Sequence, residues 1–215
     1  MTELLIADDH PLFREALRGV VARTFPETVI YEADSFNSLH EMVEHHADAD
    51  LLLLDLDMPG SSGFSALVHL RFSQPQLPIA IISAHEDPSV IRRAIDHGAI
   101  GFIPKSSSAS VLANAIRQII EGESWIPQDL SDVAGANDDE LKIAERIKEL
   151  TPHQFRVLQM LQSGLLNKQI AYELGVSEAT IKAHMTHVLR KLGASNRTQA
   201  VLIASQLNIP ENPDL

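Results

Sequence analysis

The sequence predicts an α/β fold, a doubly wound five-stranded parallel sheet, followed by a small all-α domain of four helices. Two observations lead to this prediction. In the first 125 residues, short apolar runs alternate with segments whose apolar residues recur at helical spacing. After residue 150 the spacing is helical throughout. Alternating strands and helices produce a parallel sheet that is covered on both faces. The expected strands are residues 4–7, 29–31, 51–54, 79–82 and 101–103.

Composition supports a folded protein and narrows its class. Hydrophobic residues make up 45% and charged residues 21% of the 215, which is close to the average for globular domains. The absence of cysteine excludes disulfides and thiolate metal sites and fits a reducing compartment. No apolar run is long enough to span a membrane, and no basic segment followed by a long apolar one opens the chain. We therefore expect a cytoplasmic protein with no membrane partner.

Three parts are expected along the chain. Residues 1–125 form the α/β domain and residues 150–215 the helical domain. Between them, residues 126–149 form an acidic linker, of which residues 128–140 are polar enough to be exposed. The linker ends in a short amphipathic helix, which could pair with a second copy or pack against its own domain. The apolar positions of that helix are Leu141, Ala144, Ile147 and Leu150.

The helical domain carries clear start and stop signals. Thr151 and Gln154 have the spacing of a capping box, with Pro between them at the first helical position. Asn167 is expected to cap a second helix, which Gly175 ends. Ser177 is expected to cap a third helix that runs to about residue 192, and a fourth covers about 198–207.

Polar residues follow four of the five expected strands. Asp8 and Asp9 follow the first strand, Asp55 the third, Ser83 the fourth and Lys105 the fifth. The carboxyl ends of parallel strands form one edge, so these side chains should converge there. Three close carboxylates repel one another unless a cation lies among them, and Mg²⁺ prefers such oxygen ligands. For any single aspartate, capping of the following helix is an alternative explanation.

A metal ion, an ammonium group and a hydroxyl group together can bind a phosphoryl group. The cations neutralise the phosphoryl oxygens and the hydroxyl donates a hydrogen bond to them. A central carboxylate can then act as the nucleophile. The site is therefore expected to handle phosphoryl groups.

Residues 4–10, 53–60, 82–84 and 101–106 resemble the receiver domain of bacterial response regulators, a CheY-like fold, over about residues 1–125. The resemblance implies that Asp55 accepts a phosphoryl group from a sensor histidine kinase. It also implies that Asp8, Asp9, Asp55 and the backbone carbonyl of Asp57 bind Mg²⁺. Ser83 and Lys105 would contact the phosphoryl group, and Phe102 would turn inward as a switch residue or serve only as a core residue of the fifth strand.

An alternative interpretation is that the protein is an enzyme. Asp55 and Asp57 have the Asp-x-Asp spacing of Mg²⁺-dependent phosphatases that form an aspartyl-phosphate intermediate. Those enzymes usually place the motif after the first strand, whereas here it follows the third. We therefore expect a protein without independent substrate turnover.

The third helix of the second domain has the pattern of a recognition helix. Ile181, Met185, Val188, Leu189 and Leu192 share one arc of the helix, which we expect to be core. The opposite arc carries small, hydroxyl and basic residues, which suit close approach to a major groove. Candidate DNA-binding residues on this helix are Lys182, Ala183, Thr186, His187, Arg190 and Lys191, with Ser177 and Thr180 at its start.

Residues 150–208 closely resemble the four-helix DNA-binding domain of the LuxR and NarL type. The likeness implies that Lys168, Lys182, Lys191 and Arg197 contact DNA. It also implies that the last helix serves dimerisation, through Ala200, Val201, Ala204 and Leu207. Taken together, the two resemblances indicate a NarL/FixJ-type transcriptional response regulator. Its expected partners are a sensor histidine kinase, promoter DNA and a second copy when phosphorylated, with RNA polymerase as a further candidate. A phosphorylation-independent regulator and a helical protein-docking module are the alternatives.

Charge is distributed unevenly between the parts. The net charge of −12 argues against DNA binding by the chain as a whole. Residues 1–125, however, hold 8 Lys and Arg against 18 Asp and Glu, whereas residues 150–209 hold 6 against 2. The acidic part could therefore shield the basic part. Relief of such masking and promotion of dimerisation are both open as switch mechanisms.

Overall fold

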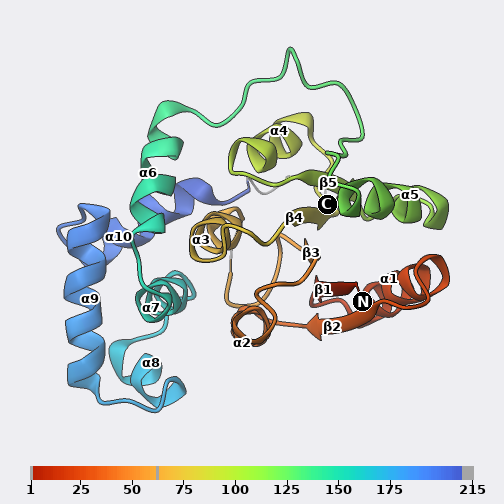
Figure 1. Cartoon of the computed structure of the whole chain (residues 1–215). Coiled ribbons are helices and arrows are strands. Elements are labelled where there is room, and N and C mark those ends of the chain that lie inside the picture. The colour runs from red at the N-terminus through yellow and green to blue at the C-terminus, as the bar shows by residue number, and fades with distance from the viewer. Residues whose placement is uncertain (1, 62, 210–215) are drawn as a thin grey trace.

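The computed structural model describes residues 2–61 and 63–209 (Figure 1). Residues 210–215, the end of the expected second domain, lie outside the described residues. Within the described part of the chain, no helix is both long and apolar enough to cross a membrane.

All five expected strands form one parallel sheet, as predicted. They are β1 (Glu3–Ala7), β2 (Val29–Ala33), β3 (Leu51–Leu54), β4 (Ile79–Ser83) and β5 (Gly101–Pro104), in the order β2-β1-β3-β4-β5. Each strand pairs in parallel with its neighbours. The direction of winding reverses between β1 and β3, and such a reversal opens a crevice at the carboxyl edge of a sheet.

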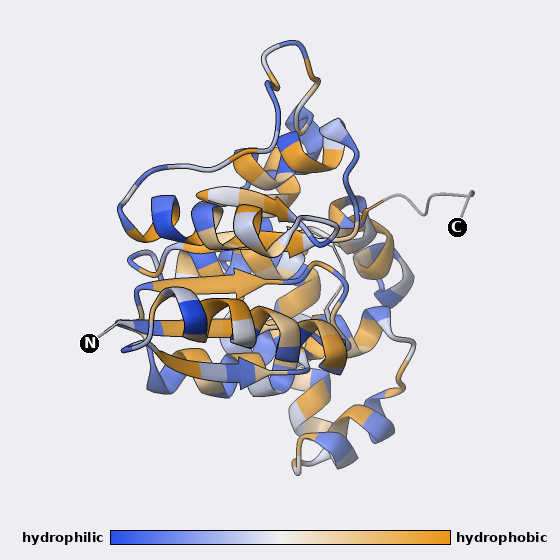
Figure 2. Cartoon of the chain, turned by 90° about the vertical axis from the view of Figure 1, so that its right-hand side faces the viewer, coloured by the Kyte–Doolittle hydropathy of each residue, from blue (hydrophilic) through white to orange (hydrophobic). Residues whose placement is uncertain are grey.

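Helices cover both faces of the sheet (Figures 1 and 2). On one face, α1 (Pro11–Thr24) and α5 (Ala109–Ile120) pack against Leu4 and Ile6 of β1. On the other, α2 (Phe36–His45), α3 (Ser65–Ser73) and α4 (Pro88–Asp96) pack against Leu5 and Ala7. Successive side chains of a strand point to opposite faces, so this split follows from strand geometry. Leu12, which fits the helical spacing of α1, is nevertheless exposed.

The second domain is helical, with α7 (Pro152–Gln162), α8 (Asn167–Glu173), α9 (Glu178–Leu192), α10 (Arg197–Ala204) and the short 3-10 helix η1 (Ser205–Leu207). The capping box of Thr151 and the cap at Ser177 form as predicted. The prediction for Asn167 was wrong, because the cap position is Leu166. The backbone N–H of Leu166 donates to Oε1 of Gln169, and this bond replaces a side-chain cap.

The linker is less exposed than its composition indicates. Leu130 is buried, and Glu140 is 4% exposed despite its charge. The linker helix α6 (Asp138–Lys148) forms, and Ala144, Ile147 and the following Leu150 are buried as predicted. Only Leu141 differs, because it is exposed and Ile143 is buried instead. The helix packs against α3, α9 and η1, and therefore contacts both domains.

The two domains share one hydrophobic core. Phe155 of α7 makes an edge contact with Phe36 of α2, with ring centroids 5.2 Å apart. It also stacks on His69 of α3, with centroids 4.1 Å apart and planes inclined by 5°. Buried residues of α6, α7 and α10 join the cluster beneath α2, α3 and α4. The helical domain thus docks on the face of the α/β domain opposite α1 and α5.

Candidate functional site

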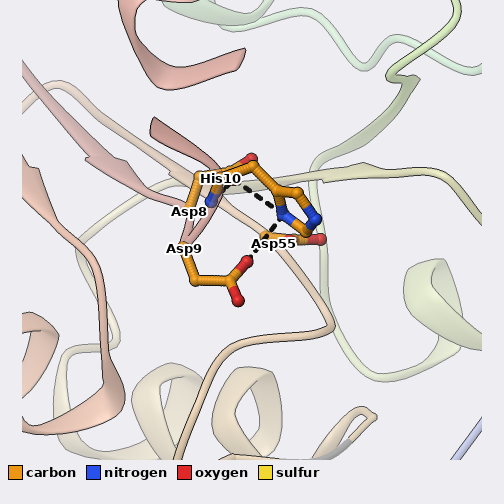
Figure 3. Close-up of side chains that lie close together, drawn as sticks. All are labelled: Asp8, Asp9, His10 and Asp55. Carbon is orange, nitrogen blue, oxygen red and sulfur yellow. Dashed lines mark hydrogen bonds and ion pairs between the residues drawn. The ribbon is translucent and has the colours of Figure 1, made fainter. Parts of the chain in front are cut away.

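The predicted acidic residues meet at the carboxyl edge of the sheet (Figure 3). Asp8 and Asp9 follow β1, and Asp55 follows β3, the strand that pairs with β1 where the winding reverses. Together with His10 they offer ligand atoms that all lie within 4.8 Å of one another. The convergence predicted from strand ends is therefore present.

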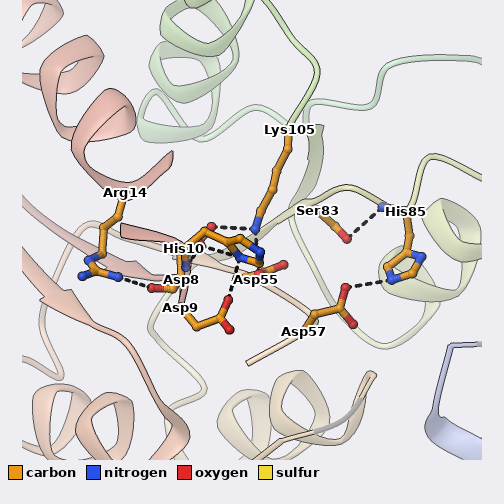
Figure 4. A network of polar contacts seen from close by, with 9 residues as sticks. All are labelled: Asp8, Asp9, His10, Arg14, Asp55, Asp57, Ser83, His85 and Lys105. Atoms are coloured by element: carbon orange, nitrogen blue, oxygen red, sulfur yellow. Dashed lines mark hydrogen bonds and ion pairs between the residues drawn. The ribbon is translucent and has the colours of Figure 1, made fainter. Parts of the chain in front are cut away.

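Lys105 reaches into the same cluster from the end of β5 (Figure 4). Its Nζ lies 2.7 Å from Oδ2 of Asp55 and 2.8 Å from Oδ2 of Asp8. Burial raises the pKa of the Asp55 carboxyl, and the Lys105 ammonium opposes this shift only in part. Burial would lower the pKa of Lys105, but the carboxylates of Asp55 and Asp8 outweigh it and raise that pKa. Lys105 is accordingly a fixed positive charge beside Asp55.

The cluster suits a hard divalent cation. Oδ1 of Asp55 is buried and has no hydrogen-bond partner in the described part of the chain. An orphaned buried carboxylate oxygen is costly unless something binds it. Carboxylate oxygens of Asp8, Asp9 and Asp55 are the donors that Mg²⁺ accepts. The residues of this cluster therefore fit the predicted ion.

Two further residues extend the site on the β4 side. Ser83 is fully buried, and its Oγ accepts a hydrogen bond from the backbone N–H of His85 at 3.2 Å. Nε2 of His85 lies 2.7 Å from Oδ2 of Asp57, so a histidine closes the site across from Lys105 (Figure 4). Phe102 is fully buried on β5. Sequence reasoning missed His85, although its position two residues after Ser83 was a signal.

His10 and Arg14 were also missed as site residues. Nδ1 of His10 lies 2.7 Å from Oδ1 of Asp9, and the His10 backbone N–H donates to Oδ1 of Asp8 at 2.8 Å. Arg14 donates to the backbone carbonyl of Asp8 at 2.6 Å and pairs with Glu32 of β2. Their place one and five residues after Asp9, at the start of α1, could have indicated these contacts. Both fix the loop that carries the acidic pair.

The predicted core arc and polar arc of α9 are confirmed. Ile181, Met185, Val188 and Leu192 are buried, and Leu189 is partly buried. The candidate DNA-binding residues on the opposite arc are open to solvent, and in Figure 1 α9 lies at the edge of the molecule away from the sheet. The exposed candidates on this helix are Lys182, Ala183, Thr186, His187 and Arg190.

Several other candidate DNA-binding residues already form hydrogen bonds within the chain. Lys191 donates to the carbonyl of Glu149 at 2.6 Å and to Oε1 of Gln154 at 2.8 Å. Arg197 donates to the carbonyl of Leu165. Ser177 and Thr180 bond to each other at the helix start, and Lys168 is exposed on α8.

The candidate dimerisation residues lie mostly inside the chain. Ala200, Ala204 and Leu207 are fully buried, and Val201 is partly buried. Leu202, which sequence reasoning missed, is the large apolar side chain that α10 exposes, at 62%.

Two family models match the chain. Residues 4–117, more than half of it, match the response regulator receiver domain. Residues 148–204 match the bacterial regulatory proteins of the luxR family. The chain is a LuxR-type response regulator. The Asp55 cluster therefore lies in the receiver, and α9 lies in the DNA-binding domain.

Similar proteins match this chain over nearly its whole length. The glycerol metabolism activator of Pseudomonas putida is 42% identical over 214 residues, which cover 97% of each chain. The nitrate/nitrite response regulator NarL of Escherichia coli K12 is 30% identical, covering 96% of each. The structure of RcsB from Salmonella enterica serovar Typhimurium matches with a TM-score of 0.56 and 22% identity, covering 97% of this chain and all of that one. The LuxR-type regulator described here is accordingly a DNA-binding transcriptional response regulator of a two-component system.

Proposed function

We propose that Asp55 is the phosphoacceptor and that a sensor histidine kinase is the donor. The observation that carries this proposal is the buried Asp55 carboxylate, whose Oδ1 has no partner while Lys105 holds its Oδ2. One carboxylate oxygen of Asp55 would bond to phosphorus while the phosphorus–nitrogen bond of the donor's phosphohistidine breaks and its imidazole leaves. Asp8, Asp9, Asp55 and the carbonyl of Asp57 would hold Mg²⁺, which supplies charge neutralisation when bound.

After transfer, residues of this chain would hold the new group. Phosphorylation adds about 1.5 to 2 negative charges at neutral pH. The Lys105 ammonium would compensate part of this charge, and the hydroxyl of Ser83 would donate a hydrogen bond to a phosphoryl oxygen. Ser83 and Phe102 lie on neighbouring strands, β4 and β5. Their movement would bias the face formed by α4, β5 and α5.

The response would be altered binding of promoter DNA by the α9 face. We take residues 1–125 as the switch, 126–149 as the connector and 150–215 as the reader. Phosphorylation would favour a homodimer that reads two half-sites, and contact with RNA polymerase would follow on the promoter. These events belong to the cytoplasm, where the cognate DNA and a reducing environment are found.

Labelling by a small phosphodonor tests the acceptor. Wild-type protein with Mg²⁺ should take up acid-labile phosphate, and Asp55→Asn should take up none. Asp34→Asn is a matched control, because Asp34 also follows a strand, β2, but lies outside the cluster. Chelation of the metal should abolish labelling. Normal labelling of Asp55→Asn would disprove the assignment.

A phosphatase remains the enzymatic alternative to this proposal. It predicts steady turnover of an added phosphomonoester that depends on Asp55. We propose instead that hydrolysis is limited to the protein's own phosphoryl group, so repeated turnover of an external ester should be absent.

The relative from Pseudomonas putida is named for activation of glycerol metabolism. We propose that this chain is likewise an activator and that its targets include genes of polyol use. Genome-wide occupancy, compared between wild type and Asp55→Asn in cells grown with and without glycerol, tests this. Occupancy confined to unrelated promoters would reject it.

A further inference from the structure

An arginine, a histidine and a glutamate form a compact cluster between the receiver and the connector. Glu140 of α6 accepts hydrogen bonds on Oε1 from Nε of Arg93 at 2.8 Å and from Nε2 of His97 at 2.7 Å. Arg93 lies on α4, and His97 directly follows it. The side chains of Glu140 and His97 are 6% and 1% exposed, and that of Arg93 is 13% exposed. A charge so deeply buried is expected to be paired, and here the pairs join α4 to α6.

Arg93 also binds the end of the DNA-binding domain. Its second terminal nitrogen donates to the backbone carbonyls of Gln206 and Asn208, at 3.2 and 3.3 Å. Its guanidinium lies over the ring of Phe64, 4.7 Å from the centroid. One side chain of α4 therefore contacts both the connector helix and the turn that follows α10. The planar guanidinium fork is suited to such simultaneous contacts.

Backbone contact completes the junction at the same place. The N–H of Phe64 donates to the carbonyl of Leu207 at 2.9 Å. Gly63, at φ +55°, permits this approach, since a Cβ there would overlap the carbonyl of Leu207 and the backbone of Asn208. The contact thus depends on the absence of a side chain at Gly63.

The rest of the interface is less well paired. A cavity of about 150 Å³ separates the β3–α3 loop, at Gly60 and Ser61, from α7. Four buried polar atoms at its lining, on Ser61, Gln159, Gln162 and Asn208, have no hydrogen-bond partner among residues 2–61 and 63–209. Buried polar atoms without partners weaken an interface. The junction therefore combines one cluster of paired side chains with a cavity whose polar atoms lack partners. Because these unpaired atoms weaken it, the junction is suited to opening.

We propose that Arg93, His97 and Glu140 form a latch through which α4 holds the DNA-binding domain against the receiver, and that phosphorylation of the receiver releases it. The second part of this inference rests on the proposed function of Asp55. The latch differs from masking, because the polar arc of α9 is exposed while the latch is closed. What it restrains is the position of the whole domain, held through α6 and the end of α10.

Distances between spin labels on the full-length protein test the latch. The chain has no cysteine, so Glu121→Cys in the receiver and Glu173→Cys on α8 provide exposed and unique attachment points. The unphosphorylated wild type should give one narrow distance distribution. Glu140→Gln and Arg93→Gln should each raise the open fraction roughly tenfold to a hundredfold, since each leaves a buried charge without its partner. Far-ultraviolet circular dichroism checks that both variants remain folded.

Matched controls lie on the same two helices. Arg92→Gln removes the neighbouring arginine of α4, which pairs with Asp96 and not with Glu140. Asp139→Asn removes the neighbouring acid of α6, which pairs with exposed Lys142. Both should keep the wild-type distribution. If Glu140→Gln and Arg93→Gln also keep it, the latch is disproved.

Adding a small phosphodonor and Mg²⁺ then tests release. Wild type should shift towards the open distribution, and Asp55→Asn should not. If phosphate incorporation is verified and the distribution stays closed, release by phosphorylation is wrong. If no phosphate enters the wild type, the proposed function of Asp55 fails, while the comparison of unphosphorylated variants still decides on the latch.

Discussion

His69 shows how the domain interface constrains a single residue. Its side chain is 1% exposed, both ring nitrogens lack hydrogen-bond partners, and Phe155 from the other domain stacks on it. Burial, with a smaller contribution from nearby His40, lowers the pKa of His69 to about 4. The ring is therefore neutral in the docked form at neutral pH. When the domains separate, the ring meets water and its pKa returns towards 6.5.

The docked form should consequently lose stability in acid. Between pH 6.5 and about 4 the separated form binds a proton that the docked form does not, so docking weakens as the pH falls through this window. The full effect is about 3 kcal/mol, at 1.36 kcal/mol per pKa unit. His69→Phe should keep the stacking and flatten this dependence, as measured by the label distances between pH 7 and 4.5. An equal pH response in wild type and His69→Phe would contradict the assignment.

Glu140 contributes at the acid end of the same range. Burial raises the pKa of this carboxyl, but the bonds from His97 and Arg93 outweigh burial, and the pKa is lowered from 4.5. Its contribution to docking is present above pH 4.5 and is lost as the pH falls through the lowered pKa. Wild type and His69→Phe both contain Glu140. The difference between their pH dependences of docking therefore reports the contribution of His69 alone.

At the scale of elements, α9 divides its basic residues into two roles. Lys182 and Arg190 are exposed, whereas Lys191 is bound to Glu149 and Gln154. Exposed cations can neutralise phosphates and release counterions, and bound ones mainly support the domain.

Lys182→Ala and Arg190→Ala should each weaken promoter binding and reduce the slope of log affinity against log salt by about 1. Lys142→Ala on α6 is the control, as another exposed lysine outside the polar arc. Fluorescence anisotropy across a salt series measures this. An unchanged slope in both α9 variants would place DNA binding elsewhere.

The approach of α3 to η1 gives a second prediction at this scale. Gly63→Ala should open the domain junction, because the new methyl group overlaps the Leu207 carbonyl. Gly60→Ala is the matched control, since Gly60 also has a positive φ, but a Cβ there meets only Phe36 within its own domain at 3.5 Å. Both variants bear backbone strain. If only Gly63→Ala opens the junction, the cause is the overlap with the Leu207 carbonyl and not the strain.

Elements fixed by local signals could be predicted from the sequence. The strands, the Thr151 capping box and the acidic cluster depend on short-range patterns and on the rule that parallel strands end at one edge. Other features depend on contacts between distant segments. The acid-rich composition of the connector indicated exposure, yet Glu140 is buried because α4 supplies its partners from 47 and 43 residues away. No local sequence pattern indicates that these residues meet, so the latch could not be predicted.

At the scale of the whole molecule, docking leaves the reading face free. The polar arc of α9 is exposed while Phe155 and the end of α10 are held by the receiver. The structure therefore does not support shielding of the basic domain by direct cover from the acidic one.

Affinity for a duplex that carries a single half-site should accordingly differ by less than about twofold between wild type and Glu140→Gln, since one half-site requires only the exposed arc. A duplex with two half-sites should discriminate between them, because two readers must be positioned together. Titrations on both duplexes measure this. If Glu140→Gln binds the single-half-site duplex more tightly than wild type does, the receiver masks the DNA-binding face after all.

The position of Glu140 in the connector also bears on how such proteins recombine. The partners of Glu140 come from α4 and the residue that follows it, so the receiver and the connector form one packed unit. A chimaera that joins a foreign receiver at residue 125 would retain Glu140 without Arg93 and His97 and would leave its charge unpaired. Exchange of input modules in this lineage should therefore succeed only when the junction lies beyond α6, or when residues equivalent to the α4 pair travel with the new receiver.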